Sequence, residues 1–353
     1  MSLCPYWART SFLSREVRKM LYAGLDVHME SSHVTVMDES GKVIRRRSIP
    51  STREAIHRQL DGNGESVKAV MEATRGWGPI YDWLEEVCQE VLLAHPLKVR
   101  AIAEARIKTD KIDSETLAHL LRADLVPEAY APSRPVRAVK RVLRQRLFLV
   151  RVRTMLKNRI QALLRSHAVE RPSFSDLYGK AGMKWLGSVE LPYPDGELLG
   201  EDLALLEVLN ERIESTEQLI EKLSEGDAAV RWLKSIPGIG RFLSVLIRYE
   251  VDDIGRFRNP KKFASYTGLV PSTYASGGRR YHGRLTKQGN KWLRWALIEA
   301  VWPAIRVAPD LRRYYERIKR RHGSKTARAA TARKIAHLVW HVWTEEREYE
   351  VRR

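Results

Sequence analysis

The segment MLYAGLDVHMESSHVTVMDESGKVIRRRSIP, residues 20–50, decides the fold of the first part of this chain. It contains three candidate strand runs: LYAGLDV (21–27), which is mostly apolar, SHVTVMD (32–38), which is rich in β-branched residues, and KVIRRRSI (42–49). Breaks near residues 30–32 and a turn at 40–41 separate these runs. Short runs bounded by turn signals are typical of strands, so we predict three consecutive strands in a meander.

Alternating helical and extended segments follow the meander. The run STREAIHRQL (51–60) begins with a helix-start signal, and WGPIYDWLEEVCQ (77–89) is an amphipathic helix. The short apolar runs VKAVMEA (67–73) and EVLLA (90–94) are typical of strands. This order predicts an α/β domain with a mixed sheet over residues 20–128. Residues 1–19 lack an apolar secretion signal, and we interpret them as an N-terminal extension, with Met20 as a second candidate start.

Two long helices are predicted next, within residues 129–227. The first runs from about Pro135, in the favoured first helical position, to His167, and a Pro/Gly-rich linker at 171–196 precedes the second. Apolar residues of the second helix, between Leu206 and Leu223, step by three and four in a heptad pattern. The pattern fits a coiled-coil arm between chains and a helical hairpin within one chain equally well. Residues 228–353 are predicted to form a mostly α-helical domain.

The charge balance indicates a polyanionic partner. The chain has 62 Lys and Arg against 43 Asp and Glu, a formal net charge of +19 and a pI near 10.0. Residues 129–169 hold 11 basic side chains and no acidic one, and residues 254–353 hold 24 basic against seven acidic. Neutralised phosphates release condensed counterions, so we expect binding to nucleic acid, with Arg144 and Arg151 of the first long helix as candidate contacts. A basic ribosomal or membrane-surface protein has a similar balance.

The cysteines and the hydropathy of the chain indicate the cellular compartment of the protein. The two cysteines, Cys4 and Cys88, have no metal-ligand spacing and no evident disulfide framework, which fits a reducing cytoplasm. No apolar run approaches the ~20 residues that a membrane span requires. We therefore expect a cytoplasmic protein without a membrane partner.

Four carboxylates stand at positions that suit a metal site. Asp26 ends the first predicted strand, close to Gly24, where we expect a ligand to approach the backbone. Glu72 closes a later strand, and the three-residue spacing of Asp110 and Asp113 puts them on one face of a helical turn. Asp26 and Glu72 would emerge side by side if the first and fourth strands are neighbours. Converging carboxylates need cations, and Mg²⁺ prefers oxygen ligands.

Three segments of the first domain carry a family resemblance: LYAGLDVHME (21–30), VMEATRGWG (70–78) and RIKTDKIDSETLAHLL (106–121). They resemble the DEDD transposase domain of the bridge-RNA-guided insertion-sequence family. That domain is similar to Holliday-junction resolvases, so the resemblance implies an RNase H-like fold. Matched residue by residue, the acidic tetrad of the family falls on catalytic, metal-binding residues of this chain: Asp26, Glu72, Asp110 and Asp113.

The turn IPGIG (236–240) lies between two apolar helical segments. This hydrophobic-Pro-Gly-hydrophobic-Gly pattern resembles the helix-hairpin-helix element, whose backbone N–H groups bind a DNA phosphate at a helix N-terminus. We expect Gly238 and Gly240 to contact DNA. A tight turn without a ligand is the alternative.

The run YTGLVPSTYASGGRRYHGRLTKQGNKWLRWAL (266–297) contains the second candidate site. Ser276 precedes two glycines in a predicted loop, and four candidate nucleic-acid contacts follow it: Arg279, Arg280, Arg284 and Lys287. A serine that attacks phosphorus needs an exposed hydroxyl and cations around the non-bridging oxygens. A flexible linker beside a phosphate-binding face is the alternative from the residues alone.

The run from IPGIG through SGG and GRLTKQGN resembles the second transposase domain of the same family, where the serine at the position of Ser276 is the nucleophile. The resemblance implies a transposase, a site-specific DNA recombinase that uses Mg²⁺ and a transient phosphoserine–DNA bond. Its implied partners are DNA, a guide (bridge) RNA and further copies of the chain in a dimer or tetramer. Two alternatives remain open: a metal-dependent Holliday-junction-type nuclease, which does not need the serine, and a non-catalytic nucleic-acid-binding protein.

Overall fold

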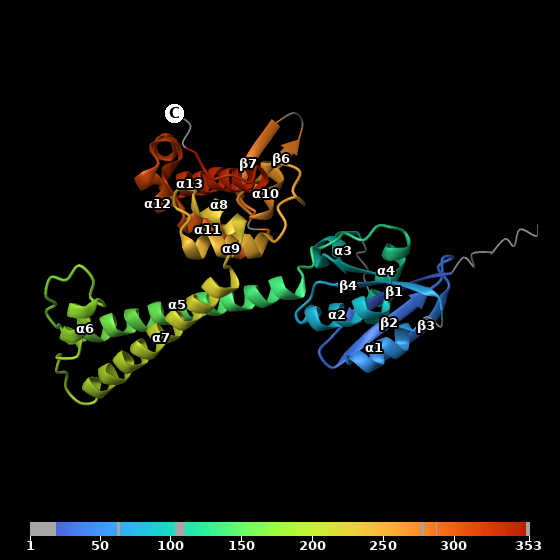
Figure 1. Cartoon of the computed structure of the whole chain (residues 1–353), viewed down its shortest axis with the longest axis horizontal. Helices are drawn as coiled ribbons and strands as arrows, with labels where there is room; N and C mark the ends of the chain where they lie inside the picture. Colours follow the sequence, from blue (N-terminus) through green and yellow to red (C-terminus); the bar gives the residue numbers. More distant parts are fainter. Residues whose placement is uncertain (1–18, 62–63, 103–109, 277–278, 287, 351–353) are drawn as a thin grey trace, which may run out of the picture. The chain divides into compact units, whose positions relative to one another are not determined.

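The computed structural model describes residues 19–61, 64–102, 110–276, 279–286 and 288–350. For Lys111, and for residues 273–276 and 279–282, it describes the backbone alone. The chain divides into two compact units between Ala131 and Pro132, and each unit is described by itself (Figure 1).

The first unit contains one mixed sheet of five strands, which are β1 (Met20–Val27), β2 (Ser31–Met37), β3 (Val43–Pro50), β4 (Ser66–Glu72) and β5 (Glu90–Ala94). Their order across the sheet is β3-β2-β1-β4-β5. The first three strands pair antiparallel, which confirms the predicted meander, and β4 and β5 continue the sheet parallel to β1. The first and fourth strands are therefore neighbours.

Helices cover both faces of this sheet (Figure 1). On one face, α1 (Arg53–Leu60) and α2 (Trp77–Val87) bury their apolar residues against the strands. On the other face lie α3 (Pro96–Ile102) and α4 (Asp110–Arg122). The α/β class and the mixed sheet predicted from the sequence are confirmed.

Strand alternation decides which face each side chain takes. Leu25 of β1 and Met71 of β4 are completely buried in the core that α1 and α2 cover. Because successive side chains of a strand point to opposite faces, the next residues, Asp26 and Glu72, belong to the face that α4 covers.

Gly24 marks the place where α4 lies directly on β1. A Cβ atom at this position would be 2.1 Å from the carbonyl oxygen of Ser114 and 2.5 Å from the backbone nitrogen of Ala118. Beside this contact, the hydroxyls of Thr35 and Ser114 share a buried hydrogen bond of 2.9 Å. The expectation of a ligand at Gly24 is wrong, because the backbone of α4 fills the space that the missing side chain leaves.

The second unit begins with the two predicted long helices, α5 (Arg134–Ser166) and α7 (Asp195–Leu223). A short helix, α6 (Lys180–Leu186), interrupts the predicted linker. Among the described residues, no helix is both long enough and apolar enough to cross a membrane.

The heptad residues of α7 pack against α5 of the same chain. Leu206 shares a buried cluster with Ile160 of α5. Ile220 lies in a second cluster with Leu143 of α5. Of the two arrangements that the heptad pattern left open, the structure shows the intrachain hairpin, so these side chains are already covered within one chain.

Ion pairs also join the two long helices. Nη2 of Arg146 lies 2.6 Å from Oε1 of Glu217, and Nε of Arg159 lies 2.8 Å from Oδ2 of Asp202. The acidic helix thus neutralises part of the basic helix, and fewer cations of α5 are available to a polyanion than its sequence alone indicates.

The rest of the second unit is a helical core that carries one strand pair. The core is formed by α8 (Ala228–Lys234), α9 (Arg241–Val251), α10 (Pro260–Tyr266), α11 (Lys291–Glu299), α12 (Val301–Val307) and α13 (Pro309–Thr344). The strand pair consists of β6 (Pro271–Ser276) and β7 (Arg279–Leu285). The mostly helical class is confirmed, but the loop predicted around Ser276 is wrong, since alternating segments on either side of a glycine pair form a hairpin.

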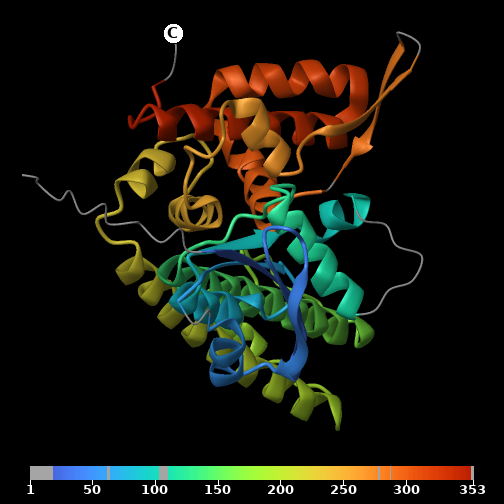
Figure 2. The same cartoon turned by 90° about the vertical axis from the view of Figure 1, so that its right-hand side faces the viewer.

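The last helix, α13, consists of two halves joined at Gly323. The φ of 79° and ψ of 168° at this residue lie in a region that only glycine adopts readily. The ammonium nitrogen of Lys334 lies 4.8 Å from the ring centroid of Tyr314, so the second half folds back along the first (Figure 2).

Candidate functional site

Asp26 and Glu72 stand at the ends of neighbouring strands. The parallel pairing of β1 with β4 runs as far as Leu25 opposite Met71, so the next residue on each strand is one of the two acids. On the other side of β1, Asp26 pairs in register with His33 of β2. The structure therefore places the two predicted residues at the same end of neighbouring strands.

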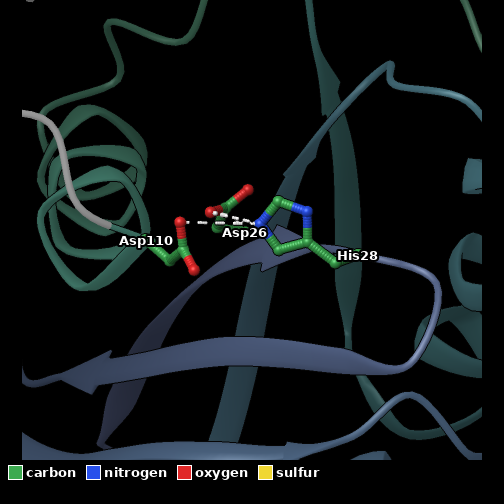
Figure 3. A group of neighbouring side chains, drawn as sticks. All are labelled: Asp26, His28 and Asp110. Carbon is green, nitrogen blue, oxygen red and sulfur yellow. Dashed lines mark ion pairs between the residues drawn. The ribbon is translucent and has the colours of Figure 1, made fainter.

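Asp110 reaches this end of the sheet from α4. It is the first residue of the helix, and Asp113 lies in the same first turn. One ligand atom each of Asp26, His28 and Asp110 lie within 4.8 Å of one another (Figure 3). The contact at Gly24 helps to set this spacing, because Gly24 precedes Asp26 on the same face of β1 and holds α4 against the strand.

Two histidines belong to the cluster, and neither was predicted from the sequence. Nε2 of His28 lies 3.3 Å from Oδ2 of Asp26 and 3.6 Å from Oδ1 of Asp110, so the imidazole bridges the two carboxylates (Figure 3). Nδ1 of His33 lies 3.7 Å from Oδ2 of Asp110. The signal was present in the register of the first two strands, which places His33 opposite Asp26.

The surroundings of Asp26 oppose its negative charge. Its side chain is 17% exposed, whereas the side chains of Asp110 and His28 are about half exposed. Burial raises the pKa of Asp26; the carboxylates of Asp110 and Asp113 raise it further, while His28 acts in the opposite direction. A bound cation would relieve both the burial of charge and the repulsion between carboxylates.

The donor set suits a divalent metal. The carboxylates of Asp26 and Asp110 supply the oxygen ligands that hard cations such as Mg²⁺ prefer. His28 offers a nitrogen at the same place, which first-row transition metals accept more readily than Mg²⁺ does. These three residues could therefore hold a divalent ion, and Asp113 is near enough to raise the pKa of Asp26, whereas Glu72 is not part of this group of three.

Ser276 is the last residue of β6 and pairs in register with Arg279, the first residue of β7. The serine thus stands at the end of a paired strand. Lys287 and the side chains of Ser276, Arg279 and Arg280 lie outside what the structure describes. Arg284, which is described, is exposed on β7.

The two glycines of the IPGIG turn, between α8 and α9, have different surroundings. A Cβ atom on Gly238 would lie 2.1 Å from the carbonyl oxygen of Ala300, so this glycine allows the turn to pack against the helical core. Gly240 is exposed and precedes the first residue of α9. Of the two predicted phosphate contacts, Gly240 has the surroundings that such a contact needs, and Gly238 faces protein.

The two candidate arginines of α5 also differ. Arg144 donates hydrogen bonds from Nε and Nη2 to Oε1 of Glu250, at 3.2 and 2.9 Å, and its guanidinium lies 5.7 Å from the ring centroid of Trp292. Glu250 is almost completely buried, so the guanidinium of Arg144 balances an internal charge. Arg151 is exposed on α5 and remains a candidate contact for nucleic acid.

Comparison with known proteins shows that two segments of the chain are similar to transposase families. Residues 23–168 match a family described as transposase, of the IS110 DEDD type, and residues 230–316 match the family described as transposase IS116/IS110/IS902. A protein of Pseudomonas aeruginosa described as a "probable family 20 transposase" is 27% identical over 339 residues, which are 92% of this chain and 97% of that protein.

Two transposases of insertion elements show similar coverage. The transposase for insertion sequence element IS1328 of Yersinia enterocolitica is 26% identical over 91% of this chain and 96% of its own. The transposase for insertion sequence element IS1111A of Coxiella burnetii is 23% identical over 95% and 93%. The similarity therefore extends over nearly the whole length of this chain and of its relatives.

Proposed function

We propose, from the premise that this chain is a member of the IS116/IS110/IS902 transposase family, that it is a DNA recombinase that cuts and rejoins strands during transposition. The observation that carries the proposal is the cluster of Asp26, His28 and Asp110 at the end of the sheet. This cluster lies within the segment that matches the DEDD transposases. Clustered carboxylates of this kind suit metal-assisted displacement at a phosphodiester.

In this proposal, Mg²⁺ is held by Asp26, Glu72, Asp110 and Asp113. Mg²⁺ held there would supply positive charge against the charge that develops on the reacting phosphodiester. The chain supplies the positions of the ligands: two strands present Asp26 and Glu72, and the first turn of α4 presents the other two acids. His28 lies between two of the carboxylates and can accept or release a proton there.

Ser276 is the proposed nucleophile. Its Oγ loses a proton to a base and bonds to the phosphorus, while the bond from phosphorus to one deoxyribose oxygen breaks and that oxygen takes up a proton. In the second step, a deoxyribose hydroxyl of the new partner strand attacks the phosphoserine, which rejoins the DNA and restores the serine. One ester replaces another in each step, so no further energy source is needed. Arg279 and Arg280, which pair with the end of β6, are proposed to stabilise charge on the phosphate oxygens.

Further parts of the proposal concern fold and partners. The strand order β3-β2-β1-β4-β5, with acids on β1 and β4, supports an RNase H-like first domain. Exposed cations such as Arg151 support contacts to DNA or to a guide RNA. Assembly into a dimer or tetramer, and action in the cytoplasm, complete the proposal.

A trapped protein–DNA adduct tests the nucleophile. We would incubate the chain with Mg²⁺, DNA that carries an element end, and RNA transcribed from the flank of the element, and then look for DNA-linked protein on a denaturing gel. We expect Ser276→Ala to lose the adduct and strand exchange while keeping its fold and DNA affinity. Ser272→Ala, on the same strand, is the matched control and should keep the adduct, strand exchange, the fold and the DNA affinity. An adduct that survives Ser276→Ala would place the nucleophile elsewhere.

A metal-dependent nuclease is the second candidate, because the carboxylate cluster is assembled within the first unit alone. Such an enzyme uses water as its nucleophile, so its strand breaks carry no protein adduct. Cleavage without an adduct, unchanged in Ser276→Ala, would favour the nuclease. Cleavage that persists in EDTA would exclude both metal-dependent mechanisms.

A further inference from the structure

A cleft of about 980 Å³ lies between β7 and the two halves of α13. Residues 283–285 of β7 form one wall, Tyr314 comes from the first half of α13, and residues between Lys325 and Leu338 come from the second half. The fold of α13 at Gly323 brings these surfaces together. The volume falls in the range of sites that hold small organic ligands, roughly 300–1,000 Å³.

The charged residues that line this cleft are basic, namely Arg284, Lys325, Arg333 and Lys334. Within the described part of the chain, no aspartate or glutamate lines it. Several cations around one concave surface, without a carboxylate among them, attract an anionic ligand. The cleft therefore favours a group that carries phosphate.

The remaining lining is largely apolar and contains one aromatic ring. Leu269, Leu285 and Leu338 contribute aliphatic surface, and the half-buried ring of Tyr314 lies among them. Aromatic side chains beside cations bind single-stranded nucleic acid, because every base has a face that stacks. The combination fits a flat base joined to a phosphate.

His337 adds a polar atom to this lining. Its Nε2 is buried and has no hydrogen-bond partner among the described residues. Burial, and after it the nearby Arg333, lowers the pKa of His337, so its ring is neutral near pH 7. Because buried polar atoms are rarely left without a partner, a polar atom of a ligand would supply the missing hydrogen bond once the ring of His337 turns toward the cleft.

We propose that the cleft between β7 and α13 binds an unpaired nucleotide of a DNA strand, with the base against Tyr314 and the phosphates against Arg284, Lys325 and Arg333. The bases of an intact duplex are stacked inside it and cannot enter such a cleft. The cleft would therefore distinguish an unpaired strand end from paired DNA. This inference rests on the proposed function, because it takes DNA to be the substrate.

The cleft and the proposed nucleophile lie at opposite ends of one strand pair. Pro271 and Leu285, which pair with each other, line the cleft. Ser276 pairs with Arg279 at the other end. From Arg284 to Arg279 the strand extends ~17 Å at the usual rise per residue. A strand held in the cleft would therefore continue along β7 toward the serine.

The test compares two DNA duplexes that differ only in a short unpaired tail. Fluorescence anisotropy would measure the affinity of the full chain for each duplex at low salt. We expect the wild type to bind the tailed duplex about tenfold more tightly, since stacking of one base supplies this much. Tyr314→Ala should lose this preference and keep its affinity for the blunt duplex, and Lys325→Gln should reduce the preference. Tyr314→Phe keeps the ring and should keep the preference. Arg320→Gln, which removes an exposed cation of α13 outside the cleft, is the matched control.

The outcomes separate the inference from the proposed function. Equal affinity of the wild type for both duplexes, or a preference that survives Tyr314→Ala, would overturn the cleft as a nucleotide site and leave the recombinase proposal standing. A tail without bases that binds as well as the natural tail would overturn the role given to the base. Stronger preference for an unpaired RNA tail than for DNA would overturn DNA as the ligand. Failure of the wild type to bind either duplex would contradict the proposed function, and the inference with it.

Discussion

The carboxylate cluster and the strand that ends in Ser276 are built in opposite ways. Asp26 stands on the central strand of a five-stranded sheet, and Asp110 stands on α4, which a backbone contact at Gly24 holds against that strand. The serine ends a strand that pairs with β7 alone in a two-stranded sheet. Figure 2 shows this pair extending beyond the helices of the second unit.

This difference shows which contacts determine the geometry of each site. Strands in a packed sheet are fixed by many contacts, so the spacing of Asp26 and Asp110 is a property of the folded core. An isolated strand pair is only marginally stable in water, so the position of the serine depends on what the pair contacts. We therefore expect the spacing of the metal ligands to be set before DNA binds, and the position of Ser276 at the far end of the strand pair to be set by contacts with DNA.

The largest effect is expected for a change in the carboxylate cluster. Asp113→Asn removes a charge from the first turn of α4 and should lower DNA cleavage in Mg²⁺ on the order of 100-fold or more. Binding to DNA and the unfolding temperature should change little. Asp124→Asn, beyond the other end of α4, is the control. Cleavage of labelled DNA by Asp113→Asn at the rate of that control would show that the residue is not a ligand.

Gly24→Ala should cause the largest loss of stability. The new Cβ would meet the carbonyl oxygen of Ser114 at 2.1 Å, so α4 must move away from β1, at a cost of about 3 kcal/mol or more. Gly200→Ala is the matched control: this glycine lies in α7 with open space around it, and alanine there should stabilise the helix by about 1 kcal/mol. Urea unfolding of both variants measures the contrast. Equal stabilities would mean that α4 does not rest on Gly24.

Ile213→Asp tests the intrachain hairpin. Ile213 is buried on α7, so a carboxylate there should destabilise the second unit by about 3 kcal/mol or more. Leu219→Asp on the same helix, where the side chain is 45% exposed, should change stability by only about 0.5 kcal/mol. Thermal unfolding followed by circular dichroism compares the two. A stable Ile213→Asp chain of reduced mass in light scattering would instead assign this residue to an interface between chains.

Asp26→Asn should have the smallest effect on the stability of the fold, and one of opposite sign. The pKa of Asp26 is raised in the folded chain, chiefly by burial, so wild-type stability falls as pH rises from the ordinary aspartate pKa through the raised one. Without metal, the variant should therefore unfold a few degrees higher than the wild type at pH 7, and the difference should vanish in acid. Added Mg²⁺ should raise the unfolding temperature of the wild type only. A variant that is less stable than the wild type at pH 7 without metal would contradict this assignment.

The sequence predicted the first unit well because its signals are local. Strand runs and turn residues between positions 20 and 94 correspond to all five strands of its sheet, and the strand order then follows from few alternatives. His28 and His33 escaped prediction because their proximity to Asp110 depends on three-dimensional packing of α4. The prediction of a ligand at Gly24 was wrong for the same reason. A glycine indicates that another group packs close to the backbone, but it does not show whether that group is a ligand or a helix of the same chain.

For the second unit, the sequence patterns predicted the observed packing less well. The heptad of α7 was visible in the sequence, yet nothing in that pattern distinguishes a partner helix of the same chain from one of another chain. Arg144 belongs to an acid-free run of basic residues, but Glu250, far along the chain, takes up its charge. Ser276 was predicted in a loop because two glycines follow it, whereas the structure pairs its backbone with Arg279 at the end of β6.

The pairing of α5 with α7 has a consequence for the search for DNA. Because carboxylates such as Glu217 and Asp202 neutralise arginines of α5, much of the uncompensated positive charge belongs to residues 254–353, with 24 basic against seven acidic residues. Long-range attraction accelerates association and orients a molecule before contact. The region that carries Ser276 should therefore meet the duplex first. As salt screens this attraction, association should become slower and each sliding encounter shorter.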